Sequence, residues 1–245
     1  MKDSFRALND RKESFTAPRR TVLLAGLGAL AGCAAPGYRG PDRDIAIVAG
    51  ERGGLYLAFA ELLAAEINRA VPELRVRAVA TEGSVANVGL LATNSAQLGL
   101  MLADTAEAAI EGQPPFTTQQ PLQAVGRVYE NYLQLVVAAD GPVRTLGDLA
   151  GRRISLGAAG SGAALVGDRV FAIAGLDPAP KIEHRQLSQA VTGLERGELD
   201  ALLWSGGVPT PLLAELDGRI SIRLLALDGV LGSVQIGRAS CRERV

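Results

Sequence analysis

The stretch ISLGAAGSGAAL, residues 154–165, decides how we interpret this sequence. An apolar run ends at Gly157, a glycine-rich corner follows at Gly160-Ser161-Gly162, and a helical pattern begins immediately after it. Such a strand-to-helix corner points several backbone N–H groups and the positive end of a helix at one place, which suits an anion. The stretch therefore predicts one half of a ligand clamp, and the rest of the chain has to supply the other half.

Length and composition limit the classes of function. The 245 residues are enough for one large domain or two small lobes, and a hydrophobic content of 48% excludes a disordered chain. Because 25 basic residues balance 26 acidic ones and aromatic residues make up only 4%, nucleic-acid binding is not expected. Two cysteines and one histidine leave almost nothing for a metal site or a cysteine nucleophile, and we expect no cofactor.

Residues 1–33 have the pattern of an export signal. Arg19 and Arg20 precede a short apolar run, which is followed by small residues. The motif LAGC, residues 30–33, resembles a bacterial lipobox, which implies lipidation of Cys33 and attachment to a membrane. Ordinary cleavage that leaves Cys33 as a chance thiol stays open, as does export by the twin-arginine route. We expect a protein outside the cytoplasm, with residues 34–43 as a flexible tether.

Beyond the tether, predicted strands and helices alternate. Strands are expected at 44–48, 74–80, 98–102, 122–131, 132–139, from 152, and at 182–186, 200–204 and 220–227. We expect Ser84 and Ser188 each to cap a helix, and Asp104 with Glu107 to open another as a capping box. The alternation predicts an α/β fold with mostly parallel sheets flanked by helices. Two lobes are expected, at 44–125 and 126–234.

The last residues, 235–245, continue none of these patterns. They resemble the translated read-through of a sequencing adapter, which implies a non-native tail and a missing return of the chain to the first lobe. A natural basic tail is the alternative.

Four corners in series resemble one family. They read GGLY at 53–56, TEGSVAN at 81–87, GSG at 160–162 and GGVPTP at 206–211. In this order and spacing, over residues 44–227, they are similar to the extracytoplasmic solute-binding subunits of TRAP transporters, of the TAXI type. The resemblance implies a two-lobed periplasmic-binding fold of type II with the ligand held between the lobes.

The resemblance also implies a ligand, a partner and a set of site residues. The ligand would be a small organic acid or an acidic amino acid such as glutamate, handed to a TRAP-type membrane permease driven by a sodium or proton gradient. Departures such as GERG at 50–53, Leu57-Ala58 and Ala103 leave a different ligand open. The residues that match the family's binding corners are Gly54, Tyr56, Gly83, Ser84, Asn87, Ser161, Gly162, Gly207 and Val208.

One corner cannot hold an anion by itself. A helix terminus contributes about 0.3–1 kcal/mol, whereas micromolar binding needs about 8 kcal/mol. We therefore expect Arg52 and Arg127 to add a guanidinium, although a solvated surface role is equally open for Arg127. Tyr56 and Trp204 could each face the cleft or fill the core, and His184 is expected to be structural or exposed.

The leading hypothesis is a lipid-anchored binding protein that closes its lobes on a small carboxylate. A sensor lipoprotein that partners a signalling receptor is an alternative. An enzyme on the same fold is less favoured, because the sequence shows no Ser/His/Asp, Cys/His or metal-ligand constellation.

Overall fold

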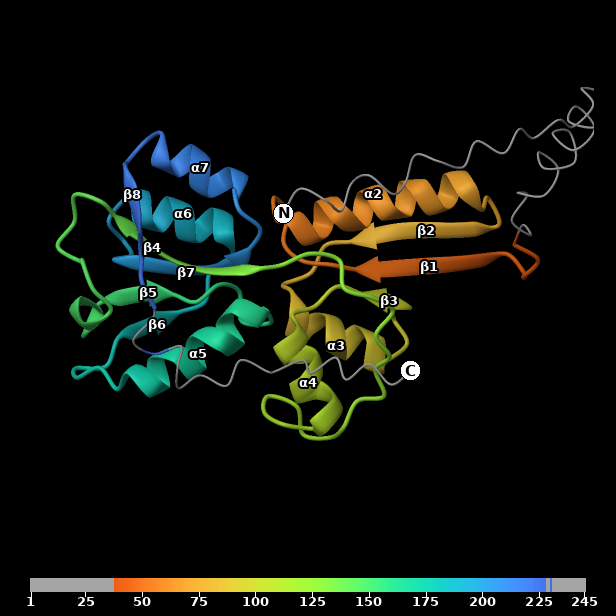
Figure 1. The fold of residues 1–245 in the computed structure, drawn as a ribbon, viewed down its shortest axis with the longest axis horizontal. Coiled ribbons are helices and arrows are strands. Elements are labelled where there is room, and N and C mark those ends of the chain that lie inside the picture. The colour runs from red at the N-terminus through yellow and green to blue at the C-terminus, as the bar shows by residue number, and fades with distance from the viewer. Residues whose placement is uncertain (1–37, 228–229, 231–245) are drawn as a thin grey trace, which may run out of the picture. The chain divides into compact units, whose positions relative to one another are not determined.

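Figure 1 shows the chain in a computed structural model, which describes residues 38–227 and Val230. The expected export signal, Cys33, the start of the tether and the expected tail lie outside these residues. From Pro41 onward the described residues belong to one compact unit, which contains two separate sheets. Within the described part of the chain, no helix has both the length and the apolar character needed to cross a bilayer.

The first sheet is short and entirely parallel. Its strands β1 (Arg43–Val48), β2 (Leu74–Val79) and β3 (Leu98–Gly99) lie in the order β2-β1-β3. Helix α2 (Leu55–Ala70) packs its apolar side against Ile47 and Val76, while Ala46 and Val48 pack towards α3 (Ser84–Ala92) on the opposite face. Helix α4 (Ala103–Glu111) follows β3 and contacts α3. Alternation along β1 therefore buries both faces of this sheet.

The second sheet is mixed. Its order is β6-β5-β7-β4-β8, with β4 (Tyr132–Ala138) antiparallel to both β7 (Ala201–Gly206) and β8 (Ile222–Leu225). Strand β5 (Arg153–Ser155) is parallel to β6 (Lys181–Glu183) and to β7. The expectation of mostly parallel sheets is correct for the first sheet and wrong for β4. That strand enters from the first lobe and runs against its neighbours.

Helices cover both faces of the second sheet. One hydrophobic cluster includes residues of α5 (Gly162–Ala174) and of β5. A second cluster joins α6 (Leu187–Glu195) and α7 (Pro211–Asp217) to Trp204 of β7. A 3₁₀ turn, η1 (Gly147–Leu149), precedes β5. Helix α7 was not expected from the sequence.

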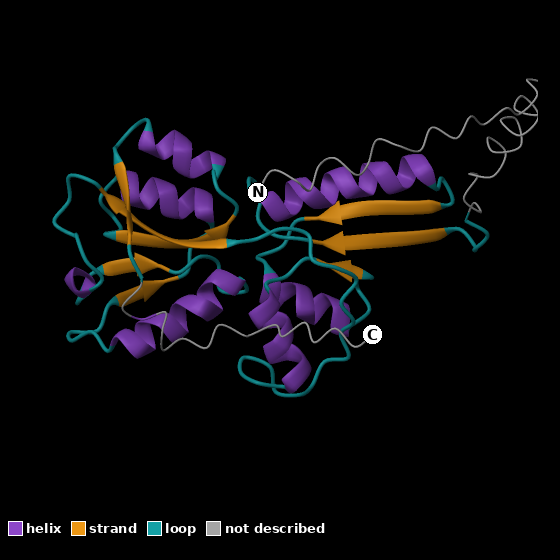
Figure 2. Cartoon of the chain, viewed as in Figure 1, coloured by secondary structure: helices purple, strands orange, loops and turns teal. Residues whose placement is uncertain are grey.

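The expected strand at 122–131 is wrong. Figure 2 shows the whole segment between α4 and β4 as loop, and most of residues 122–130 are exposed, Val125 by 90%. Among the described residues, no strand lies beside this segment to accept its backbone hydrogen bonds. It serves instead as the link between the two sheets.

The expected helix caps are also wrong. Helix α3 begins after Gly83, and the Ser84 hydroxyl accepts a hydrogen bond from the Leu102 N–H at 3.0 Å instead of capping its own helix. Helices α4 and α6 follow Leu102 and Gln186, and neither of these two residues caps its helix with its side chain. Ser84 is therefore used to tie the start of α3 to the start of α4.

Candidate functional site

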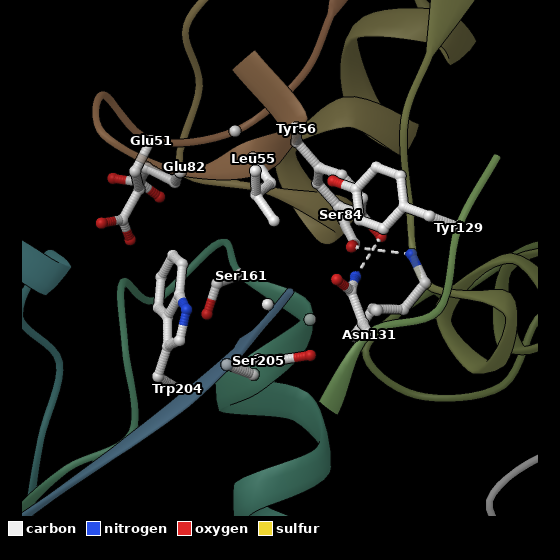
Figure 3. A pocket seen from close by; sticks show the side chains of 17 residues that line it. Glu51, Leu55, Tyr56, Glu82, Ser84, Tyr129, Asn131, Ser161, Trp204 and Ser205 are labelled. Carbon is white, nitrogen blue, oxygen red and sulfur yellow. Dashed lines mark hydrogen bonds between the residues drawn. The ribbon is translucent and has the colours of Figure 1, made fainter. Parts of the chain in front are cut away.

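A pocket lies between the two lobes, where the carboxyl ends of their strands face one another (Figure 3). Its volume is about 40 Å³, counting only space that the centre of a water molecule can reach, which is room for about three waters. The first lobe and the link contribute Gly50, Glu51, Gly54, Leu55, Tyr56, Glu82, Gly83, Ser84, Leu102, Tyr129 and Asn131. The second lobe contributes Ser161, Gly162, Ala163, Trp204, Ser205 and Gly206.

The start of α3 meets the corner before α5 across this pocket. The Ala86 N–H donates to the Gly160 carbonyl at 3.0 Å, and the Gly160 N–H donates to the Glu82 carboxylate at 3.1 Å. Gly83 allows this approach, because a Cβ there would lie 3.1 Å from the Ser161 Cα. Ser161 caps α5 by accepting from the Ala164 N–H at 3.0 Å. The Gly160 N–H, which was expected to face an anionic ligand, therefore donates to the protein's own Glu82 carboxylate.

Glu51 makes a second contact between the lobes. Its Oε2 accepts from the Leu187 N–H, at the start of α6, at 2.7 Å, while its Oε1 has no hydrogen-bond partner. The side chain belongs to a residue that is only 6% exposed. Burial raises the pKa of Glu51, nearby Glu82 adds to the rise, and the N–H groups of Leu187 and Ala158 partly offset it.

The other end of the pocket is aromatic and neutral. Tyr56 accepts a hydrogen bond from the Asn131 amide at 2.8 Å, and its ring centre lies 5.7 Å from that of Tyr129. Burial raises the pKa of Tyr129 to about 12 and also raises that of Tyr56, so both phenols are neutral at physiological pH. Trp204 forms part of the opposite wall, and its ring N–H donates to the Thr210 hydroxyl at 3.2 Å.

Six of the residues expected to bind ligand line the pocket, namely Gly54, Tyr56, Gly83, Ser84, Ser161 and Gly162. Asn87 lies outside the pocket lining and is fully buried. Its amide donates to the carbonyls of Ala49 and Leu100, both at 2.6 Å, so it ties together the segments that follow β1 and β3. Gly207 and Val208 also lie outside the lining, and Val208 is 62% exposed.

Neither expected arginine reaches the pocket lining. Arg52 is exposed, because its neighbour Glu51 takes the inward position in the loop after β1. Arg127 is exposed and pairs with Glu130 three residues along the linking segment. Asp104, expected as a cap, is buried and lies 3.9 Å from Arg169 of α5, and burial raises its pKa. The pocket lining thus contains two carboxylates and no Lys, Arg or His.

The pocket lining also contains Glu51, Glu82, Asn131 and Ser205, which were not expected from the sequence. Glu51 and Glu82 each stand in a corner directly after a strand, the position at which open α/β sheets bind ligands, and this signal could have found them. Asn131 lay in a segment wrongly expected to be a strand. Among the described residues, no group of three His, Cys, Asp or Glu side chains is arranged to hold a metal ion.

Comparison with known proteins gives the family. The model of the NMT1-like family matches residues 47–234, which is most of the chain. The chain belongs to the NMT1-like family. This match includes both lobes and every corner of the pocket.

Solved structures similar to this NMT1-like protein have the same fold at low identity. The alkanesulfonate-binding protein SsuA from Xanthomonas axonopodis pv. citri, bound to MOPS, is 21% identical at a TM-score of 0.50, over 76% of this chain and 61% of that one. A putative L-cystine ABC transporter from Listeria monocytogenes is 17% identical at a TM-score of 0.54, over 75% and 77%. A binding protein component of an ABC phosphonate transporter from Pseudomonas aeruginosa is 10% identical at 0.54, over 76% and 65%.

These structures establish the architecture. The NMT1-like protein has the two-lobed α/β fold of type II periplasmic binding proteins. It spans less than two thirds of the length of SsuA.

Proposed function

We propose that the protein is an extracytoplasmic solute-binding protein that captures a small organic solute bearing a carboxylate and delivers it to a TRAP-type transporter. The observation that carries the proposal is one pocket built from the strand ends of two lobes. Ligands of open α/β sheets bind at this edge. The similar structures, described as an alkanesulfonate-binding protein and as a component of an ABC phosphonate transporter, support solute binding on this fold. The four corner motifs support the TRAP class and a glutamate-like ligand.

The starts of α3 and α5 supply the proposed carboxylate site. Ser84, Gly162 and Ala163 line the pocket in the first turns of these two helices, where backbone N–H groups have no partner within the helix. Each helix terminus favours an anion by about 0.3–1 kcal/mol, and by up to about 2 kcal/mol when partly buried. We expect two helix termini and closure of the lobes together to supply the binding free energy that one terminus cannot.

Binding without turnover fits the side chains of the pocket. Its three serines are Ser84, which accepts from the Leu102 N–H, Ser161, which caps α5, and Ser205 on β7. No histidine, lysine or cysteine lies in the lining to activate any of them. We therefore propose a transport role, with Cys33 as a lipid anchor outside the cytoplasm and a membrane permease as partner.

A ligand panel tests this proposal. We expect at least one amino acid or dicarboxylate, at about one hundred times its dissociation constant, to stabilise the protein by about 2.7 kcal/mol. For a chain of this size that corresponds to a rise in melting temperature of roughly 5–10 °C. Differential scanning fluorimetry measures it.

Two variants make the panel specific to the pocket. Ser205→Leu places a larger side chain in the lining and should abolish the shift, whereas Ser221→Leu, on an exposed residue outside the lining, should keep it. Stabilisation by no member of the panel would contradict the proposed function. Equal shifts in both variants would contradict the assignment of the pocket.

A further inference from the structure

We infer that the pocket holds the ammonium group of its ligand, with Glu51 as the counter-charge, so that the captured solute is an amino acid or a related amine and not a carboxylate alone. This inference rests on the proposed solute-binding function. It concerns the same pocket and specifies the ligand class and the residue that selects it.

The charge balance of the pocket is the first observation. Glu51 and Glu82 stand together at one end of the pocket in Figure 3, and the lining contains no Lys, Arg or His. The N–H groups of Leu187 and Ala158 and the second carboxylate, Glu82, all act on the pKa of Glu51, and none of the three carries a positive charge. A charge buried without a cation is costly, and a ligand that brings a positive charge removes that cost.

The hydrogen-bond balance is a second, independent observation. The Leu187 N–H holds Oε2 of Glu51 at 2.7 Å and so fixes the carboxylate. Oε1 is buried and accepts no hydrogen bond of good geometry, although the Ala158 N–H lies near enough to the carboxylate to lower its pKa. An ionised carboxylate oxygen can only accept hydrogen bonds, so in the charged form of Glu51 the missing partner has to be a donor. An ammonium group has three donors, whereas a ligand carboxylate has none and would also repel Glu51.

The two ends of an amino acid then match two features of the pocket. The helix starts at Ser84 and Gly162 favour its carboxylate, and the acidic end at Glu51 and Glu82 favours its ammonium group. A second carboxylate on the ligand has no guanidinium to meet it, because Arg52 and Arg127 are exposed outside the lining. The ammonium group is thus the feature that the pocket selects.

Matched ligand pairs test the inference. Isothermal titration calorimetry on the full chain near neutral pH would compare L-glutamate with glutarate, L-glutamine with glutaramate, and L-alanine with propionate. Within each pair only the amine differs. In the pair that binds best, we expect the amine-bearing member to bind about 10- to 100-fold more tightly, the range for a hydrogen bond to a charged group.

Glu51→Gln is the decisive variant, because glutamine keeps an oxygen for the Leu187 N–H and loses the charge. The preference for the amine should fall to less than about threefold in this variant. Glu61→Gln, on the exposed side of α2, removes the same charge outside the pocket and should leave the preference unchanged.

Each other outcome has a distinct meaning. If both members of the pairs bind wild-type protein equally, the inference is wrong while the proposed function stands. If no member binds, the proposed function fails and the inference with it. A Glu51→Gln variant that folds, by circular dichroism, and keeps the full preference also overturns the assignment of Glu51. If it does not fold, the wild-type pairs alone decide. Stronger stabilisation by Ca²⁺ than by any amine would overturn the amine in favour of a metal.

Discussion

At the scale of single residues, Glu51 is a buried carboxylate with one oxygen that accepts no hydrogen bond. Burial raises the pKa of its carboxyl group, and this group accepts a hydrogen bond from Leu187 of the second lobe. The native state therefore holds a proton on Glu51 more tightly than the unfolded chain does. Its contribution to stability is fully present below the ordinary carboxyl pKa and is lost as pH rises through the raised pKa.

The upward shift of the Glu51 pKa predicts how the stability of the protein varies with pH. Between the ordinary carboxyl pKa and the raised one, the free energy of unfolding of the wild type should fall relative to that of Glu51→Gln. Urea unfolding of both proteins from about pH 4 to about pH 8 measures the difference.

Asp148 is the matched contrast. The N–H groups of Arg144 and Thr145 lower its pKa. The wild type should therefore gain stability over Asp148→Asn as pH rises from the lowered pKa to the ordinary range. The same sign for both residues would refute the burial argument for Glu51.

At the scale of elements, the start of α3 depends on one glycine. Gly83 has φ 129° and ψ −151°, a conformation that is essentially confined to glycine. We expect Gly83→Ala to lower the free energy of unfolding by about 1–3 kcal/mol. It should also weaken ligand binding, because the new Cβ would lie 3.1 Å from the Ser161 Cα.

Gly89→Ala controls for the change of residue type. Gly89 lies in the same helix, and a Cβ there would have open space around it. Alanine at this position should stabilise the protein by about 0.5–1 kcal/mol and leave binding unchanged. Chemical denaturation and calorimetry of the two variants separate the effects. Equal effects would show that Gly83 is not special.

At the scale of the whole molecule, the amides of Gly160, Ala86 and Leu187 donate hydrogen bonds across the contact between the lobes, and those of Ala86 and Leu187 lie at helix starts. The Ala86 N–H donates to Gly160, and the Leu187 N–H donates to Glu51. Both amides lie in the first turn of a helix and lack a partner within it. We expect them to exchange with deuterium together, through one opening of the lobes, and to slow together when ligand binds.

Two neighbouring amides provide the reference. The Asn87 N–H bonds to Gly83 within the first lobe, and the Ala190 N–H bonds to Gln186 within the second. These should stay more protected than Ala86 and Leu187 in the absence of ligand. Hydrogen exchange followed by NMR resolves the four amides. Unequal rates for Ala86 and Leu187 would argue against a single opening motion.

Periodicity was enough to predict most of the fold. Three consecutive apolar residues, Ala46 to Val48, are buried at the end of β1, which lies close to its expected bounds, and burial follows one side of α2. The direction of β4 could not be predicted in this way, because it depends on where the linking segment enters the second sheet. Residues 122–131 were misread because short apolar residues in a loop can imitate a strand.

The position of the pocket could be predicted from the sequence, but the charge of its lining could not. The four corners locate the pocket, since each follows a strand. Glu51 and Arg52 are neighbours in a loop, and only one of them can face inward. Side-chain direction repeats every two residues in a strand and every 3.6 in a helix, but a loop has no such repeat from which to predict which one it is. With Arg52 facing inward the pocket would suit a simple anion, whereas with Glu51 facing inward it suits a ligand that also carries a positive charge.

Trp204 has a practical consequence of its own. It is the only tryptophan among the 245 residues, it is 8% exposed, and it forms part of the pocket wall. All indole emission from this protein therefore arises at the pocket. A change in its wavelength or intensity on titration can be assigned without labelling, so the molecule carries its own optical reporter of occupancy.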